Sequence, residues 1–297
     1  MTNISAHILA DSISLDGIRI TTYELEFPRF ILPQFNTHRL FSRNAASSRA
    51  IPVNHQIELV RENTARPIHW GKNKPGMSAD EECNEYVNAT VGTLLTREQA
   101  WDYVMSSSSR VAQAFVKAGY HKQIVNRLLE PFAHIKVVCT ATEYDNFFWL
   151  RRHPDAQPEI QELANCMWDA MEASDPVLLN EGSWHTPYYE DGFWTPDSPD
   201  SLADAIAISS SCCAQVSYRK ADTSIEKANR IYARLVESEP VHASPFEHQA
   251  SPMTSDSVGI THTDVKGNMW SGNFRGWIQN RQQIEGNTCW EYSVDIE

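Results

Sequence analysis

The stretch HIKVVCTATEYDNFFWLRRHPDAQPEI, residues 134–160, contains both kinds of regular structure on which the fold depends. Its opening segment, 134–141, is compact and rich in β-branched side chains, which predicts a buried strand. The segment DNFFWLR that follows is expected to form a helix. After Pro158, a single apolar helical face is predicted for Ile160, Leu163, Ala164, Met167 and Met171. These features predict a mixed α/β (α+β) fold in which a sheet packs against several helices.

The flanking sequence extends this pattern. Residues 18–27, IRITTYELEF, alternate apolar and acidic side chains from Tyr23 onward, which is the period of a strand with one buried face. From Phe30 the apolar spacing becomes helical, and this helix is expected to run into the polar segment 37–52. Further helices are predicted by the same spacing at 101–118, 122–130, 201–214 and 224–238.

Three regions carry weaker patterns. Residues 52–98 are polar and poorly periodic and are expected to form an elaborated loop region, whereas 174–200, with four prolines, is expected to be an ordered bridge. In the C-terminal extension, 249–297, the phrase NFRGWIQNRQQIEGN is predicted to be an amphipathic helix. The alternative is an arginine-and-aromatic surface that stacks on a base or a pterin ring. No repeat divides the chain, so one domain spanning 1–297 is expected.

The composition excludes several classes of protein. The chain has 297 residues, a formal net charge of −13 and 41% hydrophobic residues, which excludes disordered and collagen-like chains. The acidic balance disfavours binding to nucleic acid polymers or anionic membranes. Because we find no basic and apolar leader and no apolar run of about 18 residues, we expect a cytoplasmic protein. The six cysteines form no CxxC pair, so we expect reduced thiols, no disulfides and no metal site.

The densest polar cluster follows the helix predicted after Phe30. It comprises Gln34, His38, Arg39, Ser42, Arg43, Asn44, Ser47, Ser48 and Arg49. Guanidinium forks and serine hydroxyls can together bind a phosphate, and Arg39 and Arg43 would share one face of a helix. A solvated basic face is the competing interpretation, and composition alone favours it.

A second basic cluster lies within a longer succession of sequence phrases. It comprises Arg127, Arg151 and Arg152, with Asn146 between them. The succession NRLLEP, TATEYDNFFWLR and AQPEI resembles the carboxy-terminal half of the flavin-dependent thymidylate synthase family, ThyX. The first cluster agrees, because QFNTHRLFSRNAASSRA resembles the family signature of an Arg-His-Arg triplet followed by a serine. Here the triplet reads Thr37-His38-Arg39 and the serine is Ser47.

A third phrase gives the order of the segments. CCAQVSYRKAD at 212–222, followed by VHASPFEH at 241–248, resembles the family's ARVSF and HETPFEH phrases. In the family these phrases precede the signature, whereas here they follow it, so the resemblance implies a circularly permuted ThyX-like catalytic domain. The permutation requires 241–248 to lie beside 34–49, with His242 near His38 and Arg39.

The resemblance implies a specific reaction. A methylene group would pass from 5,10-methylenetetrahydrofolate to C5 of dUMP, while FAD reduced by NADPH supplies the hydride. In this family no cysteine attacks the uracil ring, and catalysis rests on positioning and electrostatics. The family's active site lies between subunits of a homotetramer, so a homotetramer is implied here. Its partners would be a pyrimidine deoxynucleotide monophosphate and a folate.

Site residues follow from the same resemblance. Nucleotide contacts are implied for Gln34, Ser47, Ser48, Arg49, Arg127 and Arg151. Flavin contacts are implied for His38, Arg39, Asn146, Ser217, Ser244 and Glu247, and His242 matches a histidine near flavin and folate. For His38, His242 and His248 the competing interpretation is a core histidine satisfied within the protein.

Three positions depart from the family pattern. Thr37 replaces the first arginine of the triplet, Ala45 stands where glutamate is usual, and Ala50 where tyrosine is usual. Loss of an arginine near the flavin phosphates would remove a charge-assisted contact of about 1.5–3 kcal/mol. Two alternatives to dUMP methylation therefore stay open. One is flavin- and folate-dependent hydroxymethylation of dUMP or dCMP, and the other is a homologue that binds nucleotide or flavin without turnover.

Overall fold

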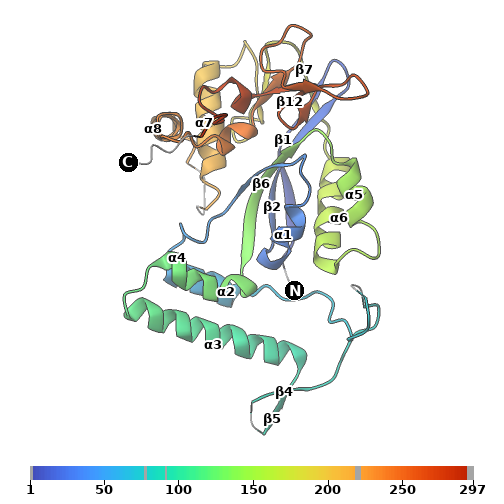
Figure 1. Ribbon diagram of the computed structural model, residues 1–297, viewed down its shortest axis with the longest axis vertical. Coiled ribbons are helices and arrows are strands. Elements are labelled where there is room, and N and C mark those ends of the chain that lie inside the picture. The colour runs from blue at the N-terminus through green and yellow to red at the C-terminus, as the bar shows by residue number, and fades with distance from the viewer. Residues whose placement is uncertain (1–2, 77–78, 91, 218–221, 293–297) are drawn as a thin grey trace.

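The computed structural model of the chain describes residues 3–76, 79–90, 92–217 and 222–292 (Figure 1). A five-stranded sheet with the order β3-β6-β2-β1-β7 forms its centre. All neighbouring strands in it are antiparallel except β1 and β7, which are parallel. The strands are β1 (Ser5–Ser14), β2 (Arg19–Pro28), β3 (Ser42–Ala45), β6 (His134–Ala141) and β7 (Val177–Leu179). The strands predicted at 18–27 and 134–141 are confirmed, and the mixed α/β fold with them.

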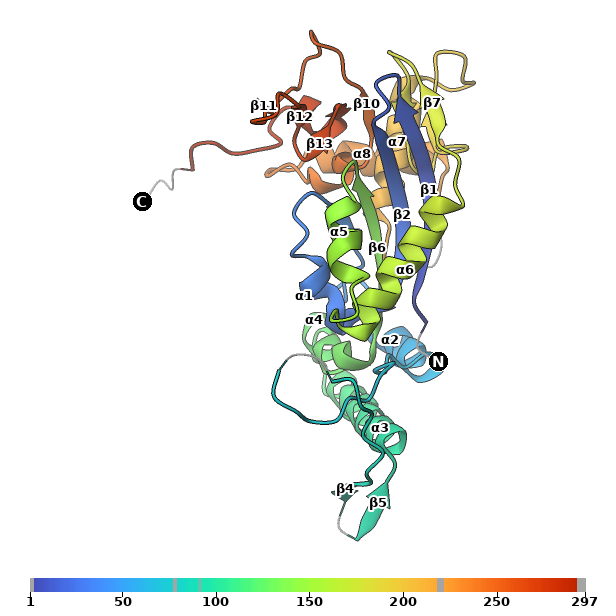
Figure 2. The same cartoon turned by 90° about the vertical axis from the view of Figure 1, so that its right-hand side faces the viewer.

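Two helices cover one face of this sheet. Figure 2 shows α5 (Asp145–Arg151) and α6 (Pro158–Glu172) lying in front of β6, β2 and β1. The alternation in β2 buries Tyr23, Leu25 and Phe27 completely on this side. Four of the five residues predicted for the apolar face of α6 are equally buried, and the fifth, Met171, packs at the edge of the same core. The buried side chains of the strand and of the helix thus pack together in the main core.

The opposite face is covered along only part of its length. There α7 (Leu202–Ala214) packs near β6, and α8 (Ile225–Val236) packs on α7. A second sheet, β14-β10-β8-β9, lies beside them. Its strands are β8 (Trp184–His185), β9 (Phe193–Trp194), β10 (Ala250–Pro252) and β14 (Trp277–Gln279), and a small third sheet is formed by β11 (His262–Thr263), β12 (Met269–Ser271) and β13 (Phe274–Arg275). The predicted ordered bridge therefore supplies β7, β8 and β9.

A helical group occupies one end of the long axis (Figure 1). It consists of α2 (Val53–Glu62), α3 (Arg97–Lys117) and α4 (Lys122–Val125), with the hairpin β4 (Val87–Thr90) and β5 (Thr93–Leu95) beyond it. Thr96 and Gln99 form a capping box that starts α3, and Gly119, at φ +86°, follows its end. The predicted helices at 101–118, 201–214 and 224–238 are confirmed.

Four expectations about local structure are corrected. The helix after Phe30 is a 3-10 turn, η1 (Arg29–Ile31), and one α-turn, α1 (Leu32–Phe35), because the following residues pair with β6 as strand β3. The segment 122–130 is likewise broken into α4 and the 3-10 turns η2 (Asn126–Leu128) and η3 (Glu130–Phe132).

The other two corrections concern the regions with weaker patterns. The loop region 52–98 begins with helix α2, whose buried residues include Ile57 and Val60. The tail phrase forms β13, β14 and the 3-10 turn η5 (Asn280–Gln283) instead of a helix. Its aromatic residues Phe274 and Trp277 are fully buried against Ile20, so they fill a core and leave no face for stacking on a ligand.

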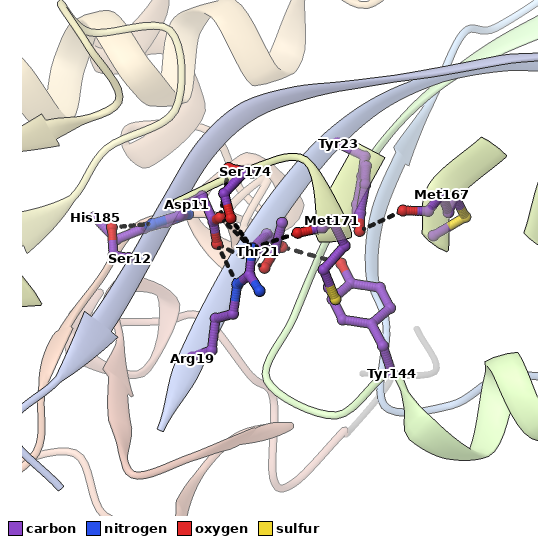
Figure 3. Close-up of polar contacts among 10 residues, drawn as sticks. All are labelled: Asp11, Ser12, Arg19, Thr21, Tyr23, Tyr144, Met167, Met171, Ser174 and His185. Atoms are coloured by element: carbon purple, nitrogen blue, oxygen red, sulfur yellow. Dashed lines mark hydrogen bonds and ion pairs between the residues drawn. The ribbon is translucent and has the colours of Figure 1, made fainter. Parts of the chain in front are cut away.

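A buried ion pair joins the β1–β2 hairpin to the end of α6 (Figure 3). Arg19 donates to both carboxylate oxygens of Asp11, at 2.8 and 2.5 Å. Thr21 Oγ1 and Ser174 Oγ donate to the same carboxylate at 3.0 and 2.7 Å. Arg19 also donates to the carbonyl oxygen of Met171, at 2.9 Å.

No helix of the described chain is long and apolar enough to cross a membrane.

Candidate functional site

A hollow of about 340 Å³ brings together three segments that are distant in the sequence. It is lined by Arg43, Asn44 and Ala45 of β3, by Cys213 and Ala214 at the end of α7 with Val216 and Ser217 just after it, and by Leu235, His242, Ser244 and Pro245. The 3-10 turn η4 (Ser244–Glu247) packs directly against β3. The juxtaposition of 241–248 with 34–49 that the permuted order requires is therefore present.

Two hydrogen bonds fix this arrangement. The amide of Asn44 donates to the carbonyl oxygen of Cys213 at 3.1 Å, across 169 positions of sequence. The backbone N–H of Ser47 donates to Ser217 Oγ at 2.9 Å, which joins one predicted nucleotide residue to one predicted flavin residue. Because Ser217 Oγ accepts this bond, its own hydroxyl hydrogen stays available for a ligand. Residues 218–221 of the third phrase lie outside the described residues.

A second group centres on His38 and Arg151. Arg151 Nε donates to His38 Nε2 at 2.9 Å, and its Nη2 donates to Thr37 Oγ1 at 3.3 Å. Burial, with the positive charges of Arg151 and Arg43, lowers the pKa of His38 to about 4. His38 is therefore neutral at pH 7 and accepts through Nε2, which orients the guanidinium. Arg151 Nη1 has no partner in the described part of the chain and can serve an anionic ligand.

A third group is held by Glu130. Its carboxylate accepts from Ser48 Oγ at 2.9 Å and from Arg127 Nη1 at 3.0 Å, and Arg29 lies 3.2 Å away. Asn126 Nδ2 donates to the carbonyl oxygen of Ser48 at 2.6 Å, so the backbone here is also fixed. Two of the predicted nucleotide-binding residues, Ser48 and Arg127, thus bind the same carboxylate. A bound phosphate would compete with this carboxylate for Arg127.

The remaining predicted residues lie apart from these groups. Gln34 donates to Gln157 Oε1, and Glu247 forms an ion pair with Arg281. Three predicted residues are exposed and have no side-chain hydrogen bond or ion pair within the described ranges: Arg39, Arg49 and Asn146. His242 is exposed at the hollow that contains Arg43, and within the described part of the chain no hydrogen bond, ion pair or ring contact joins it to His38 or Arg39.

Sequence reasoning missed several residues that now belong to the site. Arg43 lay in the polar cluster without an assigned ligand, Arg281 had been weighed only in the tail phrase as part of a surface that stacks on a base or a pterin ring, and Glu130 and Gln157 had no assigned role. The sequence signal for Glu130 was its i, i+3 spacing from Arg127 in the phrase NRLLEP. Its contacts with Arg29 and Ser48 are remote in sequence and leave no periodic signature.

A buried series of hydrogen-bonded side chains joins the second sheet to the central sheet. Ser12 Oγ lies 2.9 Å from His185 Nδ1, and His185 Nε2 lies 2.7 Å from Thr22 Oγ1. The chain continues through Thr140 Oγ1 at 2.7 Å to His248 Nδ1 at 2.8 Å. Burial lowers the pKa of His185 and of His248 to about 3 each. His248 is thus the core histidine of the competing interpretation.

Burial keeps the cysteine thiols of the core protonated. All six are free thiols. Burial raises the pKa of Cys139 to about 12 and that of Cys212 to about 11, so both are protonated at neutral pH. Among the described residues no group of three His, Cys, Asp or Glu side chains could hold a metal ion. The donors at the hollow, namely hydroxyls, an amide and a guanidinium, suit a ligand with phosphate or carbonyl oxygens.

Comparison with known proteins identifies a family. A model of the family described as thymidylate synthase complementing protein matches residues 18–177. This stretch contains every candidate from Gln34 to Arg151, whereas Ser217, His242, Ser244 and Glu247 lie outside it. Among similar solved structures is a UMP/dUMP methylase, PolB, from Streptomyces cacaoi bound with 5-Br dUMP. It is 15% identical with a TM-score of 0.41, over 60% of this chain and 92% of that chain. No curated protein sequence matches the chain.

Proposed function

The chain belongs to the family of thymidylate synthase complementing proteins, and from this premise we propose that it transfers a one-carbon unit to C5 of dUMP. Methylenetetrahydrofolate would be the donor, and FAD, reduced by NADPH, would supply the hydride when bound. The observation that carries the proposal is the hollow in which β3, Ser217 and His242 meet, because three separated family phrases converge there.

The residues divide into two sets. The nucleotide would contact Gln34, Ser47, Ser48, Arg49, Arg127 and Arg151. The flavin would lie against His38, Arg39, Asn146, Ser217, Ser244 and Glu247, with His242 facing flavin and folate. The bond from Ser47 to Ser217 joins the sets and supports one continuous site. Arginine cations placed around a dianion would hold the acceptor, and ordered hydroxyls would exclude water from the reacting edge.

The proposal includes a homotetramer with sites completed between subunits. Two observations support it. Arg39, Arg49 and Asn146 project into solvent although the family positions they match contact ligands. The long helix α3 also exposes apolar residues, with Tyr103, Val104 and Val111 at 45, 50 and 44% of their surface. A partner subunit packed there would bury that surface.

Hydroxymethylation, or a cytosine nucleotide as acceptor, is a second candidate for one specific reason. Thr37 occupies the place of the first arginine of the triplet, and its hydroxyl donates to the carbonyl oxygen of Gln34 at 2.7 Å while accepting from Arg151 at 3.3 Å. The position that carries an arginine in the family therefore carries a hydroxyl group here, and this hydroxyl group positions Arg151. This change alters the charge beside the flavin and could alter which group completes the transfer.

Analysis of the product tests the proposal. Protein reduced anaerobically is incubated with methylenetetrahydrofolate and either dUMP or dCMP, and the nucleotide is weighed by mass spectrometry. We expect methylated dUMP, while a hydroxymethyl group would support the second candidate. As a control, denatured protein should release a flavin. Nucleotide of unchanged mass from flavin-loaded protein would contradict both catalytic proposals and leave a binding homologue.

Arg151 and its neighbour Arg152 provide a matched pair of substitutions. Arg151→Ala should weaken dUMP binding by roughly tenfold to a hundredfold, since a charge-assisted contact contributes about 1.5–3 kcal/mol. Arg152→Ala should leave affinity unchanged, because Arg152 stacks on Trp168 at 4.4 Å, away from His38. Isothermal titration calorimetry measures both. Equal affinities for the two variants would remove Arg151 from the site.

A further inference from the structure

The C-terminal extension reaches the candidate site, although the family match ends at residue 177. Strand β14 of the extension pairs with β10, and its last residue, Gln279, lies opposite Ala250. Ala250 follows Glu247, the last residue of η4, by three positions, and the turn η5 that follows β14 packs on η4. The strand pairing therefore places Gln279 beside the end of η4.

Gln279 links β3 to η4 through its side-chain amide. The residue is 1% exposed, and its Nε2 donates to Asn273 Oδ1 at 2.8 Å. The same nitrogen donates to Ser42 Oγ at 3.1 Å and to the carbonyl oxygen of Glu247 at 3.3 Å. Ser42 is the first residue of β3 and Glu247 the last of η4, and both elements line the hollow. One buried amide from the extension thus holds two walls of the hollow together.

The orientation of this amide is itself fixed. Gln282 Nε2 donates to Gln279 Oε1 at 3.1 Å, so the nitrogen of the Gln279 amide faces the acceptors on β3 and η4. Gly272, at φ +59°, leaves the room that the amide needs, because a Cβ there would lie 2.5 Å from Gln279 Oε1. Asn273 Nδ2 donates to the carbonyl oxygen of Leu40 at 2.8 Å, which adds a second contact with the segment that leads into β3.

Arg281 holds the side chain of Glu247. Its Nη1 forms an ion pair with Glu247 Oε1, and its Nη2 donates to the carbonyl oxygen of Asn287 at 3.1 Å. Glu247 Oε2 has no hydrogen bond in the described part of the chain and can accept one from a ligand. The backbone and the carboxylate of Glu247 are therefore both fixed by side chains of the extension.

We propose that Gln279 and Arg281 are positioning residues for the flavin. Through their contacts they fix Glu247 relative to β3, so that its second carboxylate oxygen is held ready for an N–H or hydroxyl donor of the bound flavin. A carboxylate that is ordered before binding loses less conformational entropy when the ligand arrives, which raises affinity. This inference rests on the proposed function, in which Glu247 contacts flavin. It gives the C-terminal extension a role in the site.

The affinity of the full chain for FAD tests this assignment. Flavin-free protein is titrated with FAD, the quenching of flavin fluorescence is followed, and far-ultraviolet circular dichroism checks that each variant is folded. Gln279→Met keeps the length of the side chain but removes its donors, and should weaken FAD binding by about tenfold. Arg281→Met should weaken it by about fivefold or more, because the Glu247 carboxylate loses its charge-assisted partner. With saturating FAD, the visible circular dichroism of the bound flavin should also change, which a role in stability alone would not cause.

The matched control is Gln283→Met, at an exposed position of the same turn η5, which should bind FAD as the wild type does. Wild-type affinity in either Gln279→Met or Arg281→Met would overturn the positioning role. If Gln279→Met does not fold, Arg281→Met decides alone, since the Arg281 side chain is 30% exposed and its loss leaves no cavity in the core. Failure of the wild-type chain to bind FAD would instead overturn the proposed function, and this assignment with it.

Discussion

Lowering the pH from 7 to about 4.5 is expected to unfold the protein, because three histidines are held neutral. The pKa of His38 is lowered to about 4, and those of His185 and His248 to about 3. In the unfolded chain each returns to about 6.5, so the unfolded state binds more protons throughout this range. The contribution of these histidines to the free energy of unfolding is therefore fully present above about pH 6.5 and is lost as the pH falls toward their pKa values in the folded protein.

The expected size of this effect is large. Each histidine that is protonated only in the unfolded state contributes a slope of about 1.4 kcal/mol per pH unit, so three give about 4 kcal/mol per unit below about pH 6. A domain is typically stable by about 5–15 kcal/mol. His248 adds a specific cost, because its buried Nε2 has no acceptor for a new proton in the described structure.

Urea unfolding at pH 7.5, 6 and 5, followed by circular dichroism, measures the slope. His185→Gln cannot take up a proton and should lose about a third of it, whereas His7→Gln, at an exposed position on β1, should retain it all. A free energy of unfolding that stays constant between pH 7.5 and 5 would contradict the assignment of neutral buried histidines.

Asp11→Ala is expected to destabilise the protein by about 3 kcal/mol at pH 7. Removing one partner of a buried ion pair typically costs about 3–5 kcal/mol, and the lower end applies because the Arg19 side chain is 28% exposed and that of Asp11 4%. The variant also leaves the hydroxyls of Thr21 and Ser174 without their acceptor. The β1–β2 hairpin would then be less firmly attached to the end of α6.

Denaturant titration at pH 7 compares Asp11→Ala with Asp16→Ala, which lies in the exposed turn between the same two strands. Asp16→Ala should change the free energy of unfolding by less than about 0.5 kcal/mol. Asp11→Asn keeps the shape but removes the charge, so an intermediate loss is expected. If Asp11→Ala and Asp16→Ala unfold at the same urea concentration, the Asp11 cluster contributes nothing.

Local patterns were sufficient for the elements of the main core. Strand β6 and helix α6 were predictable because a β-branched run and a helical apolar face each arise from neighbours in sequence. The short elements were not. Residues 42–45 become strand β3 because their backbone pairs with β6, and Trp277 lies in a strand because β14 pairs with β10. In both cases the partner is remote, and no periodicity within the segment reports it.

The candidate site divides in the same way. The sequence alone determined the main-core elements and, through the phrases around His38, Arg151 and 241–248, the family that the chain resembles. Only the tertiary structure decided that Ser217 meets Ser47, that Glu130 holds Ser48 with Arg127, and that His185 and His248 lie in one buried chain. The reason is that a hydrogen bond depends on position in space within about 3 Å, whereas sequence patterns record only neighbours along the chain.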